Sequence, residues 1–283
     1  LSGLRPGELR HRDGGLGRRR RHAVSVRPGR VALVQVGALA ALLAAWEALV
    51  ASGALIEMKT GRPSEIVRFF WLGLADGSLL EHARVTLVEE LLGFGIGTVV
   101  GTAIGLGLWW SPRLSRVIEP FAVVFNGLPK IALAPPFIVW FGIYQTSKVV
   151  LAASICLVVA WLSAYNGARQ VDRDLLDMIT ALGGRRWQAF RAVIVPGAMP
   201  WVLSGLRINI GFALIGAIVG EYVASNAGLG YLAVQAAIRF RMSQLWMTIF
   251  VITALAAVQF YALLWLERRC FAWVGAEGQG VRL

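Results

Sequence analysis

The sequence is poor in charged and chemically reactive side chains. Only 16% of its 283 residues are Asp, Glu, Lys or Arg, and it has two cysteines and three histidines. No HExxH or GxSxG pattern occurs, and none of the three lysines follows a glycine, so there is no GxxxxGK[ST] phosphate-binding loop. Cys156 and Cys270 lack the spacing of a disulfide or a metal site. We therefore expect no catalytic residues, no metal site and no cofactor in this chain.

Apolar residues dominate instead. They make up 57% of the chain, and the mean hydropathy is +0.64, which is more than a water-soluble domain carries. A helix needs roughly 20 mostly apolar residues to cross a bilayer, so the chain has room for about six spans. The expected fold is an all-α polytopic membrane helix bundle. The predicted spans cover residues 31–52, 85–110, 117–143, 148–168, 201–223 and 245–266.

Positive charge is distributed unevenly along the chain. There are 28 Lys and Arg against 16 Asp and Glu, and residues 1–30 alone carry nine Arg. If the N-terminus lies inside, the inner segments hold 19 of these cations and the outer segments seven. Both termini are therefore expected in the cytoplasm, by the positive-inside rule. Residues 1–30 and 269–283 would be tails around a transmembrane domain of residues 31–268. We expect the first tail to be disordered and to bind anionic lipid rather than nucleic acid.

Two spans carry unusual backbone residues. Gly93, Gly97, Gly101 and Gly105 recur every four residues in the second span, which predicts a side-chain-free face for close helix packing. The third span contains four prolines, each of which frees a carbonyl that needs a partner in protein or in a wet cavity. This span is therefore expected to be broken, either as the wall of a transport pathway or as a structural kink.

Two cations are predicted to lie within spans. Lys130 in the third span and Arg207 in the fifth have no obvious carboxylate at their depth. Such charges face the bundle interior or reach for the interface. The two cations favour a transport pathway for an anion. In the alternative interpretation, the Arg207 side chain extends to the membrane interface and Lys130 caps carbonyls of the broken helix. The predicted pathway residues are Asn126, Pro129, Lys130, Pro135, Arg207 and Asn209, although the two amides can equally join helices.

Several carboxylates also fall within predicted spans. Glu47 and Glu221 are near the outer ends of their spans and are expected to reach lipid headgroups. In an alternative interpretation, the stretch from Glu221 to Tyr231 lines the outer mouth of the bundle. Glu89 and Glu90 are expected to be solvated near the outer surface, so we predict no proton relay.

The long inner connection, residues 169–200, predicts a short amphipathic helix outside the membrane. Asp172 or Asp174 can cap its start, and Gly183 and Gly184 end it. An apolar stripe on such a helix needs a groove, either on its own bundle or on a partner. The stripe consists of Leu175, Leu176, Met178, Ile179 and Leu182.

Residues 177–196 resemble the cytoplasmic EAA loop of binding-protein-dependent ABC importer permeases. In that loop a Glu-Ala-Ala start is followed by a Gly, nine residues and then Ile-x-Leu-Pro. Here Gly183 is followed by nine residues and then Val193 to Pro196, while Asp177, Met178 and Ile179 replace the Glu-Ala-Ala start. The residues that the resemblance assigns to ATPase coupling are Asp174, Leu175, Asp177, Met178, Ile179, Leu182, Gly183 and Pro196.

The resemblance covers about residues 31–268 and is greatest to permeases for nitrate, taurine and aliphatic sulfonates. It also rests on Trp46 and Glu47, on the stretch LPKIALAPPFIVWFGI (128–143) followed by Ser147 and Lys148, and on a glycine-rich segment after Glu221. The residues assigned to the outer mouth are Glu221, Gly228, Gly230 and Tyr231.

The resemblance implies a type I ABC importer permease in the bacterial inner membrane. Two such permeases would form a homodimer with two ABC ATP-binding subunits, which hold ATP and magnesium, and an extracytoplasmic solute-binding protein would deliver the solute. The helix from Asp174 to Leu182 would then transmit ATP-driven closure to the spans.

Two other classes are less consistent with the sequence. A secondary transporter driven by an ion gradient predicts a repeated half or carboxylates at mid-membrane depth, and inspection finds neither. A polytopic membrane enzyme would need a His, Cys or Ser constellation that the sequence lacks.

Overall fold

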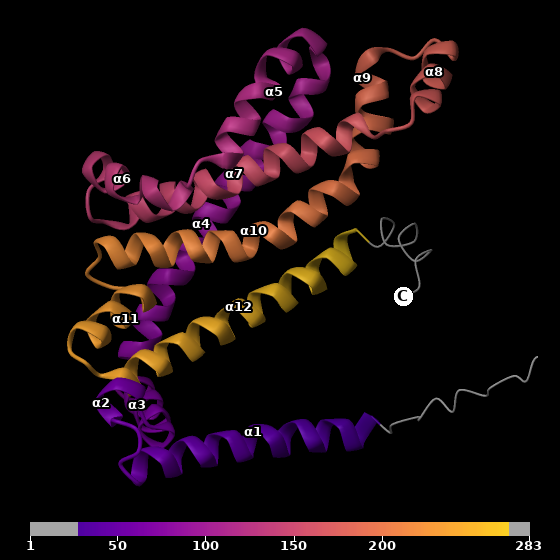
Figure 1. Ribbon diagram of the computed structural model, residues 1–283. Helices are drawn as coiled ribbons and strands as arrows, with labels where there is room; N and C mark the ends of the chain where they lie inside the picture. Colours follow the sequence, from indigo (N-terminus) through magenta and orange to yellow (C-terminus); the bar gives the residue numbers. More distant parts are fainter. Residues whose placement is uncertain (1–27, 272–283) are drawn as a thin grey trace, which may run out of the picture. The chain divides into compact units, whose positions relative to one another are not determined.

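The computed structural model describes residues 28–271, and all regular secondary structure within them is helical (Figure 1). Residues 1–27 and 272–283, which make up most of the two predicted tails, lie outside the described residues. The disorder and lipid contacts predicted for the first tail therefore lie outside them as well. The long helices are α1 (Pro28–Ala51), α4 (Ser78–Gly107), α5 (Pro112–Gly127), α7 (Gln145–Arg169), α10 (Val195–Val223) and α12 (Met242–Cys270). The shorter helices are α2 (Glu57–Thr60), α3 (Pro63–Ala75), α6 (Ala134–Phe141), α8 (Arg173–Ala181), α9 (Arg186–Ala189) and α11 (Leu229–Ile238).

Five helical segments within the described residues are long and apolar enough to cross a membrane. They confirm five of the six predicted spans, and the last four extend beyond the predicted apolar runs because polar turns continue the helices. The segments are Leu33–Ala51, Ser78–Trp110, Gln145–Arg169, Arg186–Val223 and Met242–Cys270.

The remaining predicted span, residues 117–143, is broken as the prolines indicate. It forms two helical pieces, Pro112–Gly127 and Lys130–Phe141, with an 87° bend between them. Leu128 has extended backbone at the break. Pro135 lies in the first turn of α6, where a missing N–H costs no helical hydrogen bond. The chain therefore changes direction within this apolar stretch.

The core consists of α4, α7 and α10, which pack along one another. A Cβ atom on Gly97, Gly101 or Gly105 would lie 2.8–2.9 Å from a Cβ atom of α7 and even nearer to its backbone carbonyls. This confirms the predicted packing face, because only a side-chain-free surface allows so close an approach. Asn209 of α10 ties the three helices together, since its amide donates to Thr98 Oγ1 (3.1 Å) and to the carbonyl of Cys156 (3.0 Å).

The core has two structurally distinct ends. Figure 1 shows α8 and α9 beyond one end of α7 and α10, and α6 and α11 at the other. We call these the α8 end and the α11 end. The functional side chains predicted from the sequence lie mostly at these two ends.

Candidate functional site

The helix predicted between the fourth and fifth spans is α8. The carboxylate of Asp172 accepts a hydrogen bond from the N–H of Asp174 (2.9 Å) and so caps its start. Gly183 adopts a positive φ of 77°, and the N–H of Gly184 donates to the carbonyl of Ile179 (2.9 Å). The same signals that predicted the helix from the sequence thus define both of its ends.

The apolar residues of α8 divide into two faces rather than forming one exposed stripe. Leu176 and Ile179 are half-buried, and Leu176 packs against a cluster that contains Ala168, Ile194 and Ala198. We call the other face the docking face: Leu175, Met178 and Leu182, which are 45%, 54% and 79% exposed. One side of α8 therefore attaches it to its own chain, while the other leaves three large apolar side chains uncovered.

The segment after α8 connects it firmly to α10. Arg186 donates to the carbonyl of Trp110 (2.7 Å), and its guanidinium lies 5.2 Å from the centre of the Trp109 ring. Phe190 and Trp187 stack beside these tryptophans. Pro196 is the second residue of α10, directly after the π-helical turn Phe190–Ile194. The segment after α8 is therefore attached to Trp109 and Trp110 beyond the end of α4 and continues directly into α10.

At the α11 end, Glu221 is buried rather than near headgroups, which corrects the sequence-based expectation. Only 1% of the residue is exposed, and its carboxylate accepts hydrogen bonds from Thr86 Oγ1 (2.6 Å) and from the N–H of Gly230 (2.5 Å). The N–H of Leu229 donates to the same Thr86 hydroxyl (2.8 Å). Glu221 therefore binds the glycine-rich segment at the start of α11.

The backbone of that segment depends on glycine. Gly228 has a φ of 113°, and a Cβ atom there would collide with the carboxylate of Glu221. The N–H of Gly228 donates to Nδ1 of His82 (3.1 Å), whose ring centre lies 6.0 Å from that of Tyr231. The four residues assigned to the outer mouth are therefore gathered in one place, and their part in a mouth stays a prediction.

Glu89 and Lys148 form a second buried polar group beside Glu221 that the sequence analysis missed. Each is 1% exposed, so the expectation that Glu89 is solvated was wrong. The Lys148 ammonium donates to the carbonyls of Ile143 and Tyr144, whereas Oε2 of Glu89 has no hydrogen-bond partner within residues 28–271. Both line a cavity of about 430 Å³. The register of the glycine row, extended back by four residues, places Glu89 on the packed face and would have predicted its burial.

Glu90 is also buried, contrary to expectation. Its carboxylate accepts a hydrogen bond from the Gln259 amide of α12 (2.7 Å). This contact joins α4 to α12, so Glu90 has a partner that lies far away in the sequence.

The predicted pathway residues do not meet at one point. Lys130 donates to the carbonyl of Asn126 at 3.4 Å, the geometry that carbonyl capping requires. Arg207 pairs with Glu267 of α12 at 2.8 Å, which corrects the expectation that it has no carboxylate at its depth. Asn209 is fully buried between helices. Whether these side chains contact a solute stays a prediction.

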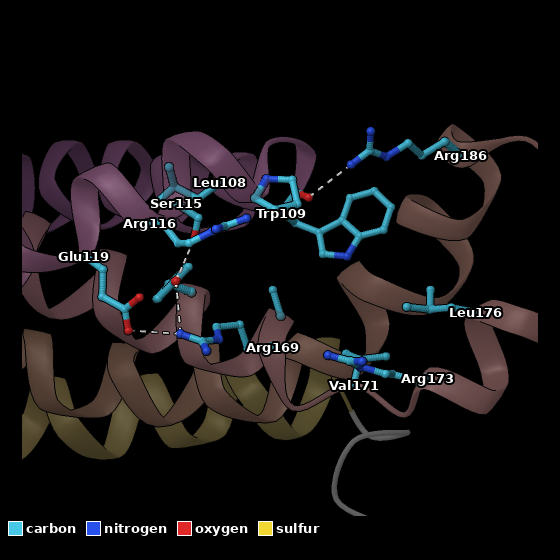
Figure 2. Close-up of a pocket in the computed structure, with 13 residues that line it drawn as sticks. Leu108, Trp109, Ser115, Arg116, Glu119, Arg169, Val171, Arg173, Leu176 and Arg186 are labelled. Carbon is cyan, nitrogen blue, oxygen red and sulfur yellow. Dashed lines mark hydrogen bonds and ion pairs between the residues drawn. The ribbon is translucent and has the colours of Figure 1, made fainter.

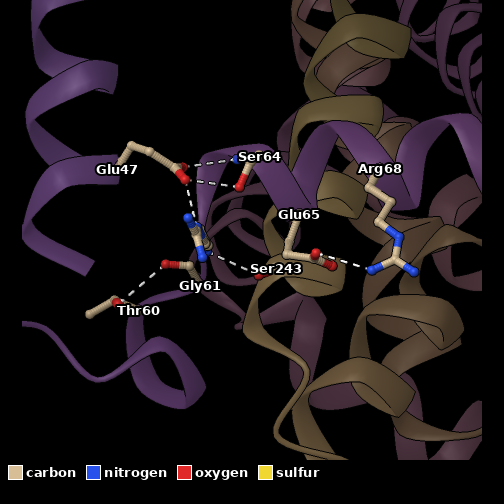
Figure 3. A network of polar contacts seen from close by, with 8 residues as sticks. Glu47, Thr60, Gly61, Ser64, Glu65, Arg68 and Ser243 are labelled. Carbon is tan, nitrogen blue, oxygen red and sulfur yellow. Dashed lines mark hydrogen bonds and ion pairs between the residues drawn. The ribbon is translucent and has the colours of Figure 1, made fainter. Parts of the chain in front are cut away.

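Glu47 likewise has protein partners rather than an exposed position among headgroups (Figure 3). Its carboxylate pairs with Nε of Arg62 (2.5 Å) and accepts hydrogen bonds from the N–H and hydroxyl of Ser64. This contact raises the pKa of the Arg62 guanidinium. The N–H of Arg62 donates in turn to Ser243 Oγ (3.0 Å), so the network fastens the start of α3 to α12.

Comparisons with known proteins agree on one family. Residues 95–271 match the model described as "Binding-protein-dependent transport system inner membrane component". ThiX, the formylaminopyrimidine transport permease protein of Halalkalibacterium halodurans, is 30% identical over 202 residues, which cover 71% of this chain and 81% of ThiX. The permease protein SsuC of Bacillus subtilis, named for aliphatic sulfonates, is 30% identical over 226 residues, 79% of this chain and 82% of SsuC.

Two further similarities extend the comparison. TauC, the taurine transport system permease protein of Escherichia coli, is 27% identical over 248 residues, which cover 86% of this chain and 90% of TauC. Among solved structures, the inward-facing MetNI methionine ABC transporter contains a chain with a TM-score of 0.58 and 20% identity, covering 65% of this chain and 92% of that one. At 20% identity, this structural similarity indicates a shared fold and nothing more about function.

Proposed function

Since this chain belongs to the family of binding-protein-dependent transport system inner membrane components, we propose that it moves a small anionic solute inward, driven by ATP hydrolysis in a separate subunit. The chain is a multi-pass membrane permease subunit of an ABC importer, and the expected type I importer permease fold is confirmed. Family membership also argues against the alternative that the chain is a secondary transporter driven by an ion gradient. The family works with an ATP-binding subunit and a solute-binding protein, and we assign the same two partners to this chain.

The docking face of α8 is the observation that supports coupling between this chain and the ATP-binding subunit. Three large apolar side chains on one face of a short helix are partly left in water unless a partner covers them. Full burial of such a side chain is worth about 1.5–3 kcal/mol, and covering the exposed part of each would contribute a share of this. The opposite face is held by the chain's own residues. We therefore assign Leu175, Met178 and Leu182 to a groove of the ATP-binding subunit. In this arrangement ATP-driven closure would move α8 as a rigid body together with α7 and α10.

A charge placed on the docking face tests this assignment. We expect Leu182→Asp to abolish copurification with the ATP-binding subunit while membrane insertion is retained, because the carboxylate would be buried without a partner. Ala181→Asp is the matched control, since Ala181 is the exposed neighbouring residue outside the docking face. Equal loss in both variants, or retained association of Leu182→Asp, would reject the docking face.

The solute is proposed from charge and from relatives. SsuC and TauC are named for sulfonates and taurine, whereas ThiX is named for a formylaminopyrimidine. The half-buried Lys130 at the break between α5 and α6 supports a solute with a negative group. We propose an alkyl sulfonate or a similarly sized anion, with nitrate as a smaller alternative. Uptake by the assembled importer, measured with sulfonates, nitrate and an uncharged pyrimidine, would identify the class of solute. Faster uptake of the pyrimidine would reject an anionic solute.

We also propose a membrane orientation and an assembly for this permease. We place α8 and both termini in the cytoplasm, because Lys and Arg are concentrated in the corresponding segments. The α11 end then faces outward, where the solute-binding protein would dock. We also propose that two copies form the permease and that the basic first tail contacts anionic lipid. Cysteine labelling of Leu182→Cys from the cytoplasmic side only would support the orientation, and labelling from outside would reverse it.

A further inference from the structure

A cavity of about 480 Å³ lies at the α8 end, between α5, α7, α8 and α9 (Figure 2). Its volume is within the range that holds small ligands. Among residues 28–271, four arginines and a single glutamate line it, one or more from each of these helices. The charged residues are Arg116 and Glu119 of α5, Arg169 of α7, Arg173 of α8 and Arg186 of α9.

Two of these arginines already have partners. Arg169 pairs with Glu119 (3.1 Å) and donates to the hydroxyl of Tyr165 (3.2 Å). Arg186 is held by the Trp109 ring and by the Trp110 carbonyl. These contacts fix the direction of both guanidinium groups, so part of the cavity wall is organised before any ligand binds.

Arg116 and Arg173 differ from that pair. Neither forms an ion pair with any residue between 28 and 271, and each lines the cavity from a different helix. One carboxylate is thus set against four guanidinium groups. The local excess of positive charge attracts an anion with several oxygen atoms, and arginine matches phosphate oxygens with paired hydrogen bonds.

We propose that this cavity binds a phosphate-bearing anion between Arg116 and Arg173. Two sources carry that chemistry, namely the headgroup of an anionic phospholipid and free phosphate. The cluster of Trp109, Trp110 and Trp187 beside the cavity is typical of a membrane interface, where indole rings lie at headgroup level. The lipid headgroup is therefore the expected source.

Occupation of the cavity would restrain α8. The anion would bridge Arg116 of α5 and Arg173 at the first residue of α8, and so hold the helix against the spans. This consequence for ATPase coupling rests on the proposed function, whereas binding of the anion does not.

Thermal unfolding of the purified full chain in detergent tests the binding. The probes are dioctanoyl phosphatidylglycerol, dioctanoyl phosphatidylcholine, which has the same phosphodiester without net charge, and inorganic phosphate. We expect phosphatidylglycerol to raise the unfolding temperature, and the pair Arg116→Gln with Arg173→Gln to raise the lipid concentration required by about tenfold or more, since charged hydrogen bonds are lost. The control pair is Arg113→Gln with Arg191→Gln, which removes two exposed arginines near the same end that do not line the cavity.

The outcomes distinguish a lipid headgroup from free phosphate, and they also show whether the cavity binds such an anion at all. A response to phosphatidylglycerol alone identifies a lipid headgroup, and an equal response to inorganic phosphate identifies the free anion. The proposal is overturned if phosphatidylcholine stabilises the chain as well as phosphatidylglycerol, if no probe stabilises it, or if the control pair weakens the response as much as the cavity pair. Arg173→Gln alone, at an exposed position, provides the same comparison if the double variant does not fold. None of these results depends on transport or on the ATP-binding subunit.

Discussion

The two ends of the α4, α7 and α10 core are completed in different ways. At the α11 end, Glu221, Thr86 and the glycine-rich segment satisfy one another in a buried network. At the α8 end, three apolar side chains of the docking face are exposed, and two arginines in a cavity have no ion pair within the described residues. One end is closed by the chain's own contacts, whereas the other presents groups that need partners. Substitutions at the α11 end should therefore mainly reduce stability, whereas substitutions on the docking face should mainly reduce association with a partner.

Removing the carboxylate of Glu221 should have the largest effect on stability. Glu221→Ala leaves the buried Gly230 N–H without its acceptor and leaves the Thr86 hydroxyl with only the His82 carbonyl at 3.2 Å, so we expect a loss of about 3 kcal/mol. Thermal unfolding of the purified chain would measure it. Glu57→Ala, at an exposed glutamate, is the control and should change little. A loss below about 0.5 kcal/mol for Glu221→Ala, the range of ordinary surface changes, would show that the network is not structural.

Gly228→Ala should have the next largest effect. The added Cβ combines an unfavourable positive φ with a collision against the Glu221 carboxylate, and we expect about 2 kcal/mol. Gly142→Ala separates the two causes, because Gly142 has a similar backbone conformation (φ 81°, ψ 178°), while a Cβ atom there would meet only an ordinary contact at 3.6 Å. If both variants lose the same stability in thermal unfolding, the collision contributes nothing.

The ion pair between Arg207 and Glu267 should contribute less. The Arg207 side chain is 48% exposed and the Glu267 side chain 7%, so solvent screens the pair and we expect about 1 kcal/mol. A double-mutant cycle with Arg207→Gln and Glu267→Gln, followed by thermal unfolding, isolates the interaction. Additive losses would mean that the two side chains act independently.

The docking face should show the smallest effect on stability. Leu175→Ser and Leu182→Ser shorten side chains that are already exposed, so we expect changes within about 0.5 kcal/mol for the isolated chain. Affinity for the ATP-binding subunit should fall in the same variants, as measured by copurification. A large loss of stability in the isolated chain would indicate that α8 packs against its own protomer instead.

Local features of the sequence predicted α8 and the spans well. Asp172 and Gly183 define the ends of α8 through contacts within a few residues, and uninterrupted apolar length identifies the spans. The partners of Arg207 and Glu47 could not be read in this way. Glu267 lies 60 residues from Arg207, and Arg62 lies beyond the end of the span that holds Glu47, so only the packing of helices brings these groups together.

The sequence by itself determined that the chain is a membrane helix bundle, that its third predicted span is broken, and that an amphipathic helix connects the fourth and fifth spans, because hydrophobic length, proline and capping act locally. The tertiary structure decided which polar groups are buried and which face of α8 remains uncovered. Burial depends on neighbours from distant parts of the chain, and Glu90 illustrates this: it is buried near the end of an apolar run because Gln259 of α12, 169 residues away in the sequence, packs against its carboxylate.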